Sequence, residues 1–102
     1  MAEVIVSANA SADLERLVAF LRDEEPAVAL ATYDLALGAL DVLRAYPSIG
    51  RPVDDALREL VISRGSTGYL ALYEYDAGAD LVVILALRHQ REAGYLERGA
   101  AE

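Results

Sequence analysis

The side chains best suited to chemistry follow one another at the end of an apolar run, in the tetrad Arg88-His89-Gln90-Arg91. His89 is the only histidine, and because an imidazole titrates near neutral pH it could serve as a general acid or base. The two arginines could hold a phosphate or a carboxylate through paired hydrogen bonds. The tetrad therefore indicates either a phosphate-handling site or a surface that contacts a partner. A histidine that simply bonds a carbonyl or an acid at the end of a strand is the plainer alternative.

Other residues could join the tetrad if the strands that carry them are neighbours. A nuclease site would draw on His89, Arg88, Arg91, Tyr95 and Arg58. A surface that binds a target or partner would draw on Arg58, Tyr69, Tyr73, Tyr75, Arg88, His89 and Arg91. The structural alternatives are salt bridges for the arginines, which contribute little when exposed, and cross-strand packing for the tyrosines.

Composition limits the kinds of site that this chain can carry. Its 102 residues predict a single domain over 1–102, and the absence of cysteine removes disulfides and thiolate chemistry. With one histidine and no pattern of acidic ligands, we expect neither a metal nor another cofactor. All nine basic residues are arginines, and the net charge of −8 predicts poor nonspecific binding to nucleic acid.

The chain is also expected to be a soluble cytoplasmic protein with no membrane association. It opens Met-Ala-Glu-Val, without the basic start and apolar stretch of a secretion signal. The apolar run from Leu81 to Leu87 is too short to cross a bilayer.

The elements that would position these residues follow from hydrophobic periodicity. A strand is predicted at 3–7, followed by an amphipathic helix whose apolar positions include Leu14, Leu17 and Leu21, with Asp13 on its solvated face. Pro26 begins a second helix that runs to about Tyr46. Its buried stripe is predicted to consist of Leu30, Tyr33, Leu37, Leu40 and Leu43, with alanines that allow close approach.

Three further strands are predicted at 57–63, 69–75 and 81–88, and a short helix at 92–98. In the middle strand we expect Leu70 and Leu72 to face the helices and the tyrosines to face the other side. The last strand, apolar on both faces, should be central. The predicted fold is α+β: a single sheet of about four strands with an antiparallel two-helix hairpin on one face, in the order β-α-α-β-β-β.

Short motifs along nearly the whole chain are similar to those of one family, the RelE/ParE toxins of type II toxin-antitoxin systems. The matching motifs are Ala12-Asp13-Leu14, Tyr46-Pro47, Gly50-Arg51-Pro52, Leu57-Arg58-Glu59-Leu60, Gly68-Tyr69, Leu72-Tyr73 and Leu87-Arg88-His89-Gln90-Arg91. The resemblance, closer to the ParE branch, implies the same β-α-α-β-β-β fold and a toxin of the plasmid stabilisation type.

The family implies two competing activities. RelE-like members cut messenger RNA in the ribosome with basic side chains, whereas ParE-like members poison DNA gyrase by protein contact. RelE-like toxins carry an arginine directly after the Gly-Tyr pair, where this chain has Leu70, and lysine is absent. A ParE-like gyrase poison is therefore favoured, with a RelE-like nuclease as the alternative and an inactive antitoxin-binding homologue as a third interpretation.

The family also implies an antitoxin that neutralises the toxin in a hetero-oligomer. A cognate ParD-like antitoxin would lay an amphipathic helix on the helical hairpin, around Leu14, Leu17, Leu21, Leu30 and Leu37.

Overall fold

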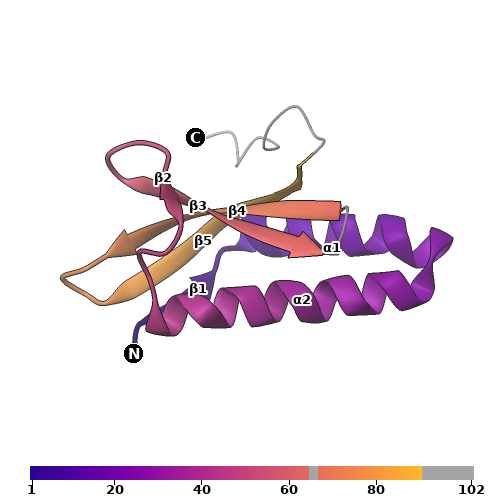
Figure 1. Ribbon diagram of the computed structural model, residues 1–102, viewed down its shortest axis with the longest axis horizontal. Coiled ribbons are helices and arrows are strands. Elements are labelled where there is room, and N and C mark those ends of the chain that lie inside the picture. The colour runs from indigo at the N-terminus through magenta and orange to yellow at the C-terminus, as the bar shows by residue number, and fades with distance from the viewer. Residues whose placement is uncertain (65–66, 91–102) are drawn as a thin grey trace.

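A helical hairpin covers one face of a five-stranded sheet in the computed structural model, which describes residues 1–64 and 67–90 (Figure 1). In chain order the elements are β1 (Glu3–Val6), α1 (Ala8–Glu24), α2 (Pro26–Ala45), β2 (Arg51–Pro52), β3 (Leu57–Arg64), β4 (Thr67–Asp76) and β5 (Leu81–His89). The predicted α+β class and element order are confirmed, with the two-residue β2 as an additional strand. The helix predicted at 92–98 lies outside the described residues.

The strands lie in the order β1-β5-β4-β3-β2, so the first and last long strands of the chain are neighbours. β1 pairs parallel with β5, and every other pair is antiparallel. β5 thus lies inside the sheet between β1 and β4, as its apolar sequence predicts.

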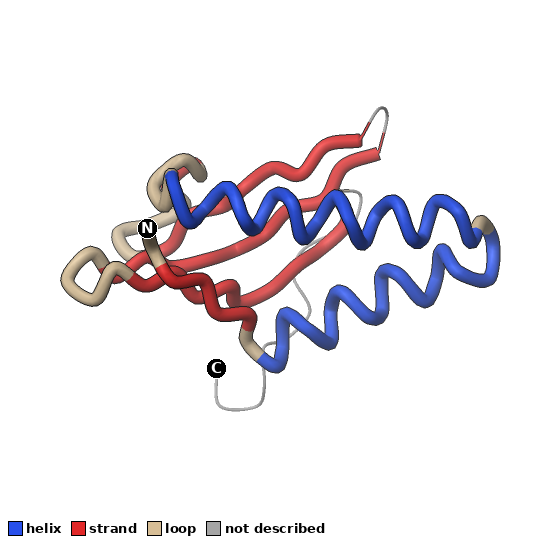
Figure 2. The backbone as a smooth tube through the Cα atoms, turned by 90° about the horizontal axis from the view of Figure 1, so that it is seen from below, coloured by secondary structure: helices blue, strands red, loops and turns tan. Residues whose placement is uncertain are grey.

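The two helices begin where the sequence supplies suitable first residues. Ser7 caps α1, accepting a hydrogen bond from the N–H of Ala10, and Pro26 occupies the first turn of α2. Figure 2 shows the helices running antiparallel across the sheet; α1 lies along β5, and α2 contacts β1 and β3. By length and composition alone, α2 could cross a membrane, since it contains an 18-residue stretch with a mean hydropathy of 1.4.

The predicted buried stripe of α2 is wrong at three of its five positions. Leu40 and Leu43 are buried, but Leu30, Tyr33 and Leu37 are 65%, 42% and 44% exposed. The other buried positions of α2 are small: Ala29, Thr32 and Ala36. Small side chains let the helix approach its neighbours closely, so the packed stripe centres on them and the larger residues beside it remain exposed.

The predicted faces of β4 are reversed. Tyr69, Ala71 and Tyr73 belong to the buried cluster beneath the helices, together with Leu40 and Leu43. Leu70 and Leu72 lie on the opposite face of the sheet, which we call the open face, and they are buried too. Because both faces of β4 are buried, alternation in the sequence could not tell which one meets the helices.

Candidate functional site

The basic residues at the end of β5 lie on opposite faces of the sheet. Arg88 is directly across from Leu70 and therefore lies on the open face, whereas His89 is across from Tyr69 on the helix face. The His89 ring meets the Tyr69 ring edge-on, with centroids 5.2 Å apart and planes at 84°. The sheet therefore separates His89 from Arg88, the first arginine of the tetrad. Arg91 and Tyr95, which were also predicted site residues, lie outside the described residues.

Arg88 turns back onto its own chain. Its Nη1 donates to the carbonyls of His89 and Gln90 at 3.3 and 3.4 Å. These long contacts hold the guanidinium beside the end of β5, still on the open face.

Arg58 is not a surface residue of the open face. Its Nη1 donates to the carbonyls of Gly50 and Ser48 at 2.8 and 3.1 Å, on the helix face of β3. The hydroxyl of Tyr73 donates to the Pro47 carbonyl at 2.8 Å and accepts from the N–H of Gly50 at 2.9 Å. Together Arg58 and Tyr73 fix the loop between α2 and β2, and burial raises the pKa of the Tyr73 phenol.

The predicted row of partner-binding tyrosines is therefore mostly core. Tyr69 and Tyr73 are buried under the helices. Tyr75 alone of the three is half-buried, and its hydroxyl donates to Asp80 Oδ1 at 2.8 Å. That hydrogen bond raises the pKa of the Tyr75 phenol, and the charges of Asp80 and Asp76 add to the effect.

An ion pair on the open face was missed by sequence reasoning. Glu59 is buried there, and its Oε1 accepts from both Nε and Nη2 of Arg51, the former at 2.9 Å. Arg51 stands opposite Glu59 across the β2–β3 pair, and its own side chain is mostly exposed. A glutamate in the middle of an apolar strand was the available signal, because a buried carboxylate needs a partner.

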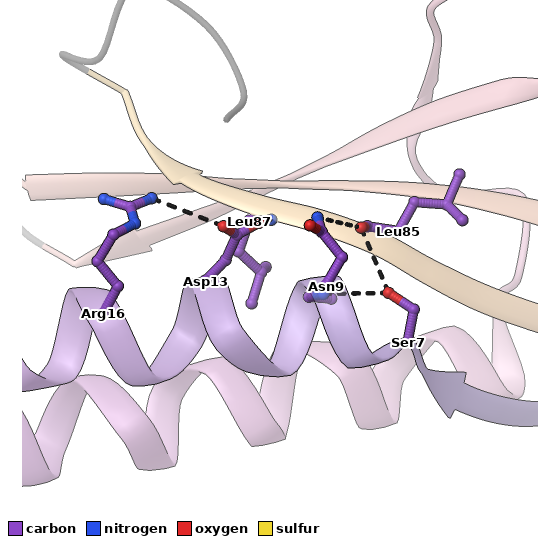
Figure 3. Close-up of polar contacts among 7 residues, drawn as sticks. Ser7, Asn9, Asp13, Arg16, Leu85 and Leu87 are labelled. Carbon is purple, nitrogen blue, oxygen red and sulfur yellow. Dashed lines mark hydrogen bonds and ion pairs between the residues drawn. The ribbon is translucent and has the colours of Figure 1, made fainter. Parts of the chain in front are cut away.

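Three polar side chains at the start of α1, those of its cap residue Ser7 and of Asn9 and Asp13, bind β5 where β1 stops, as Figure 3 shows. The side chains of Ser7 and Asn9 donate to the Leu85 carbonyl at 3.3 and 3.1 Å. Leu85 is the extra residue of a bulge, since Leu72 pairs with Ala86 and Tyr73 with Ile84. These hydrogen bonds give the Leu85 carbonyl, on the part of β5 that extends beyond β1, the partners that a neighbouring strand would otherwise supply.

Asp13 continues this set of contacts one turn further along the helix. Its Oδ2 accepts from the N–H of Leu87 at 2.9 Å, and its Oδ1 lies 3.8 Å from Arg16 Nη2 (Figure 3). Asp13 is only 4% exposed, so its assignment to a solvated helix face was wrong. The helix runs beside a strand edge that needs hydrogen-bond partners, a requirement that helical periodicity does not reveal.

The residues predicted to bind an antitoxin divide into two groups. Leu14, Leu17 and Leu21 are half-buried, whereas Leu30 and Leu37 are exposed along α2. Beside them lies an open hollow of about 240 Å³ between the helices. It is lined by Ser11, Leu14, Glu15, Val18, Arg22 and Tyr33.

Charged groups elsewhere in residues 1–64 and 67–90 do not form a metal site. No three histidine, aspartate or glutamate side chains gather there in a group that could hold an ion. The charged groups that strand alternation places on the open face of β3, β4 and β5 include Glu59, Glu74 and Arg88, and Arg51 of β2 pairs with Glu59 there.

Comparison with known proteins finds toxins. Residues 4–94 match the family model for the ParE toxin of the type II toxin-antitoxin system, parDE. Toxin RelE3 of Caulobacter vibrioides is 33% identical over 90% of this chain and 98% of its own length. Toxin RelE1 of the same organism is 37% identical over 69% of this chain and 75% of its own length.

A solved structure shares the fold as well as sequence. The toxin-antitoxin complex RelBE2 from Mycobacterium tuberculosis contains a chain that is 26% identical, with a TM-score of 0.56. The similarity covers 89% of this chain and 93% of that one.

Proposed function

The chain belongs to the ParE family of type II toxin-antitoxin toxins, and we propose that it arrests growth by binding and poisoning DNA gyrase rather than by cutting RNA. The observation that supports this proposal is the division of the candidate catalytic residues between two faces. Cleavage by a ribose 2′-hydroxyl needs a base, an acid and a cation at one phosphate. Here His89 packs on Tyr69 on the helix face, while Arg88 lies on the open face.

The roles of the remaining basic groups support the same conclusion. Arg58 holds the loop carbonyls of Ser48 and Gly50 behind the sheet, away from Arg88 and Arg51. A chain with a net charge of −8 is repelled by the phosphates of a ribosome at long range. Binding a protein target does not require a base, an acid and a cation to lie together at one point.

A cognate ParD-like antitoxin is the partner that we propose for the helical hairpin. Leu30, Tyr33 and Leu37 recur at helical spacing on α2 and are all exposed, beside the 240 Å³ hollow. An amphipathic helix could lay its apolar face there, in the helix-in-groove mode. The solved relative was crystallised as a toxin-antitoxin complex, which supports a hetero-oligomer of this kind. We also propose that this chain and its antitoxin are cytoplasmic, as action on gyrase requires.

The antitoxin surface is tested by titrating the purified antitoxin against variants of this chain. Leu37→Asp should weaken binding by about a hundredfold, because it places a charge in an apolar contact. Val61→Asp, an equally exposed position on the open face, is the matched control. Equal affinity for the two variants would place the antitoxin elsewhere.

The activity is tested by inducing the chain without antitoxin and examining DNA and RNA in the same cells. A gyrase poison should leave broken DNA and filamentous cells with intact messenger RNA, and the purified chain should trap gyrase cleavage complexes. Ribosome-dependent messenger RNA cuts with intact DNA would refute the proposal. An inactive homologue that only binds antitoxin would give no growth arrest.

The second candidate is a ribosome-dependent nuclease, which the RelE names of the two Caulobacter relatives favour. Its site would be the open face, where Arg51 and Arg88 could hold a phosphate and Glu59 lies between their strands. Arg51→Ala and Arg88→Ala would then abolish RNA cleavage. Arg44→Ala, whose side chain pairs with Asp41 on α2, is the control expected to cleave normally.

A further inference from the structure

An apolar surface at one end of the molecule belongs neither to the helical hairpin nor to the open face. Tyr46 and Ile49, which follow α2, are 64% and 56% exposed. With Pro47, Ser48 and Tyr75 they line a shallow hollow of about 430 Å³. We call these five residues the ledge.

The ledge is held rigidly from behind. Tyr73 and Arg58 bind four backbone groups of residues 47–50. The backbone of Gly50 packs so closely that a Cβ there would lie 2.7 Å from the Tyr73 ring. An apolar surface that is already ordered loses little conformational entropy when it binds a partner.

The rim of the ledge is acidic. The Tyr75 hydroxyl donates to Asp80, and the carboxylates of Asp80 and Asp76 both raise the pKa of that phenol. The nearby cations have other partners: Arg44 Nε donates to Asp41 Oδ1 at 2.9 Å, and Arg58 points to loop carbonyls behind the surface. The charge that the ledge presents at Tyr75 is therefore negative.

We propose that the ledge binds a segment of a partner protein in which a leucine or phenylalanine lies next to a lysine or arginine. The apolar side chain would enter the hollow between Tyr46, Ile49 and Tyr75, and the cation would meet Asp76 and Asp80. Negative charge disfavours nucleic acid and a second copy of this chain with its own charge of −8. Apolar area with flanking cations is the complementary chemistry.

This surface is separate from the one proposed for the antitoxin. The two hollows share no lining residue. Tyr33 of the first and Tyr46 of the second are thirteen residues apart along α2 and its end, or about 20 Å at the helical rise. The ledge can therefore bind its partner whether or not the chain arrests growth.

The test uses the full chain, made by cell-free synthesis, and two short probes followed by NMR. We expect the peptide acetyl-Lys-Leu-Phe-Arg-amide to shift the amides of Tyr46, Ile49 and Tyr75 saturably. The acidic peptide acetyl-Glu-Leu-Phe-Glu-amide should leave them unchanged. Shifts confined to Leu30, Tyr33 and Leu37, or equal binding of both peptides, would overturn the proposal.

Matched variants make the result specific to the ledge. Ile49→Ser should weaken the basic peptide about tenfold, and Asp80→Asn should weaken it and reduce its salt dependence. Leu30→Ser, an exposed leucine on α2, should bind the peptide like the parent chain. The proposal fails if the Ile49→Ser variant binds the basic peptide as tightly as the parent chain does. It also fails if ultracentrifugation shows that the parent chain is a dimer and that Ile49→Ser dissociates it.

Discussion

Asp13 on α1 accepts a hydrogen bond from the backbone N–H of Leu87 on β5, across 74 residues of sequence. The contact places a helix side chain where a neighbouring strand would otherwise supply a carbonyl. With Ser7 and Asn9 bound to Leu85, it continues the pairing of β5 after β1 has ended at Val6. α1 is thus joined to the sheet by polar contacts as well as by its leucines.

Replacing Asp13 with alanine should destabilise the chain by about 2–3 kcal/mol, because it leaves the buried N–H of Leu87 without its acceptor. Asp13→Asn keeps an oxygen acceptor and should cost less. Chemical denaturation measures both. Asp34→Ala, at an exposed position on α2, is the control and should change stability by less than about 0.5 kcal/mol. Equal losses at positions 13 and 34 would contradict this account.

Alanine substitution should change the free energy of unfolding in opposite directions at two glycines. A Cβ at Gly50 would lie 2.7 Å from the Tyr73 ring and 2.9 Å from the Glu59 carbonyl oxygen, so Gly50→Ala should destabilise by about 1–3 kcal/mol. A Cβ at Gly38, within α2, meets nothing within 4 Å, so Gly38→Ala should stabilise by about 0.5–1 kcal/mol. Thermal unfolding of the two variants provides the comparison, and shifts of the same sign would be inconsistent with the packing.

Thr32 should tolerate loss of its hydroxyl. It is buried between α2 and the sheet, and its Oγ1 has no hydrogen-bond partner among the residues that the structure describes. Thr32→Val keeps the shape and removes the unpaired polar atom, so it should stabilise by about 1 kcal/mol. Thr32→Ser retains the hydroxyl and loses a buried methyl, so it should destabilise. Urea midpoints distinguish the two changes, and a loss of stability in the valine variant would indicate a hidden partner.

The phenol of Tyr75 should titrate above the ordinary tyrosine range. Its hydrogen bond to Asp80 and the charges of Asp80 and Asp76 favour the protonated form and raise its pKa. The raised pKa belongs to the folded state, so the stabilisation is complete below the unfolded value near 10 and is lost as pH rises through the folded value.

The titration is followed by the ring-carbon NMR shifts of Tyr75. Asp80→Asn removes one charge while keeping an acceptor, and Asn tolerates the positive φ of 52° at this position. The pKa of Tyr75 should therefore fall in this variant. An unchanged titration would show that Asp80 does not control the phenol.

The sequence predicted the elements well because their signals are local. Apolar spacing, Pro26 and Pro47 bounded the two helices, and β-branched or aromatic residues between turn signals marked the four longer strands. The family resemblance, carried by short motifs in order, also held for residues 4–94. Residues close together in the sequence predict these features, whatever packs against them in the folded chain.

The candidate site was harder to predict because its geometry depends on faces and partners. Arg88 and His89 are adjacent in sequence, yet the alternation of a strand places them on opposite sides of the sheet. Tyr73 was expected at a surface and is instead buried, because its face of β4 meets the helices, and there its hydroxyl bonds to the backbone of Pro47 and Gly50. Neither outcome follows from residue type alone.

By itself, the sequence determined the two helices, the four longer strands, their order, and the acidic balance of the chain, because these depend on local periodicity and composition. The tertiary structure decided which face of β4 meets the helices, that Asp13 binds β5, and that Arg51 rather than Arg58 accompanies Glu59 on the open face. The reason is physical: both faces of β4 are buried around residues 69–73, and the backbone groups that bond to Asp13 and Tyr73 lie 23 to 74 residues away from them in sequence.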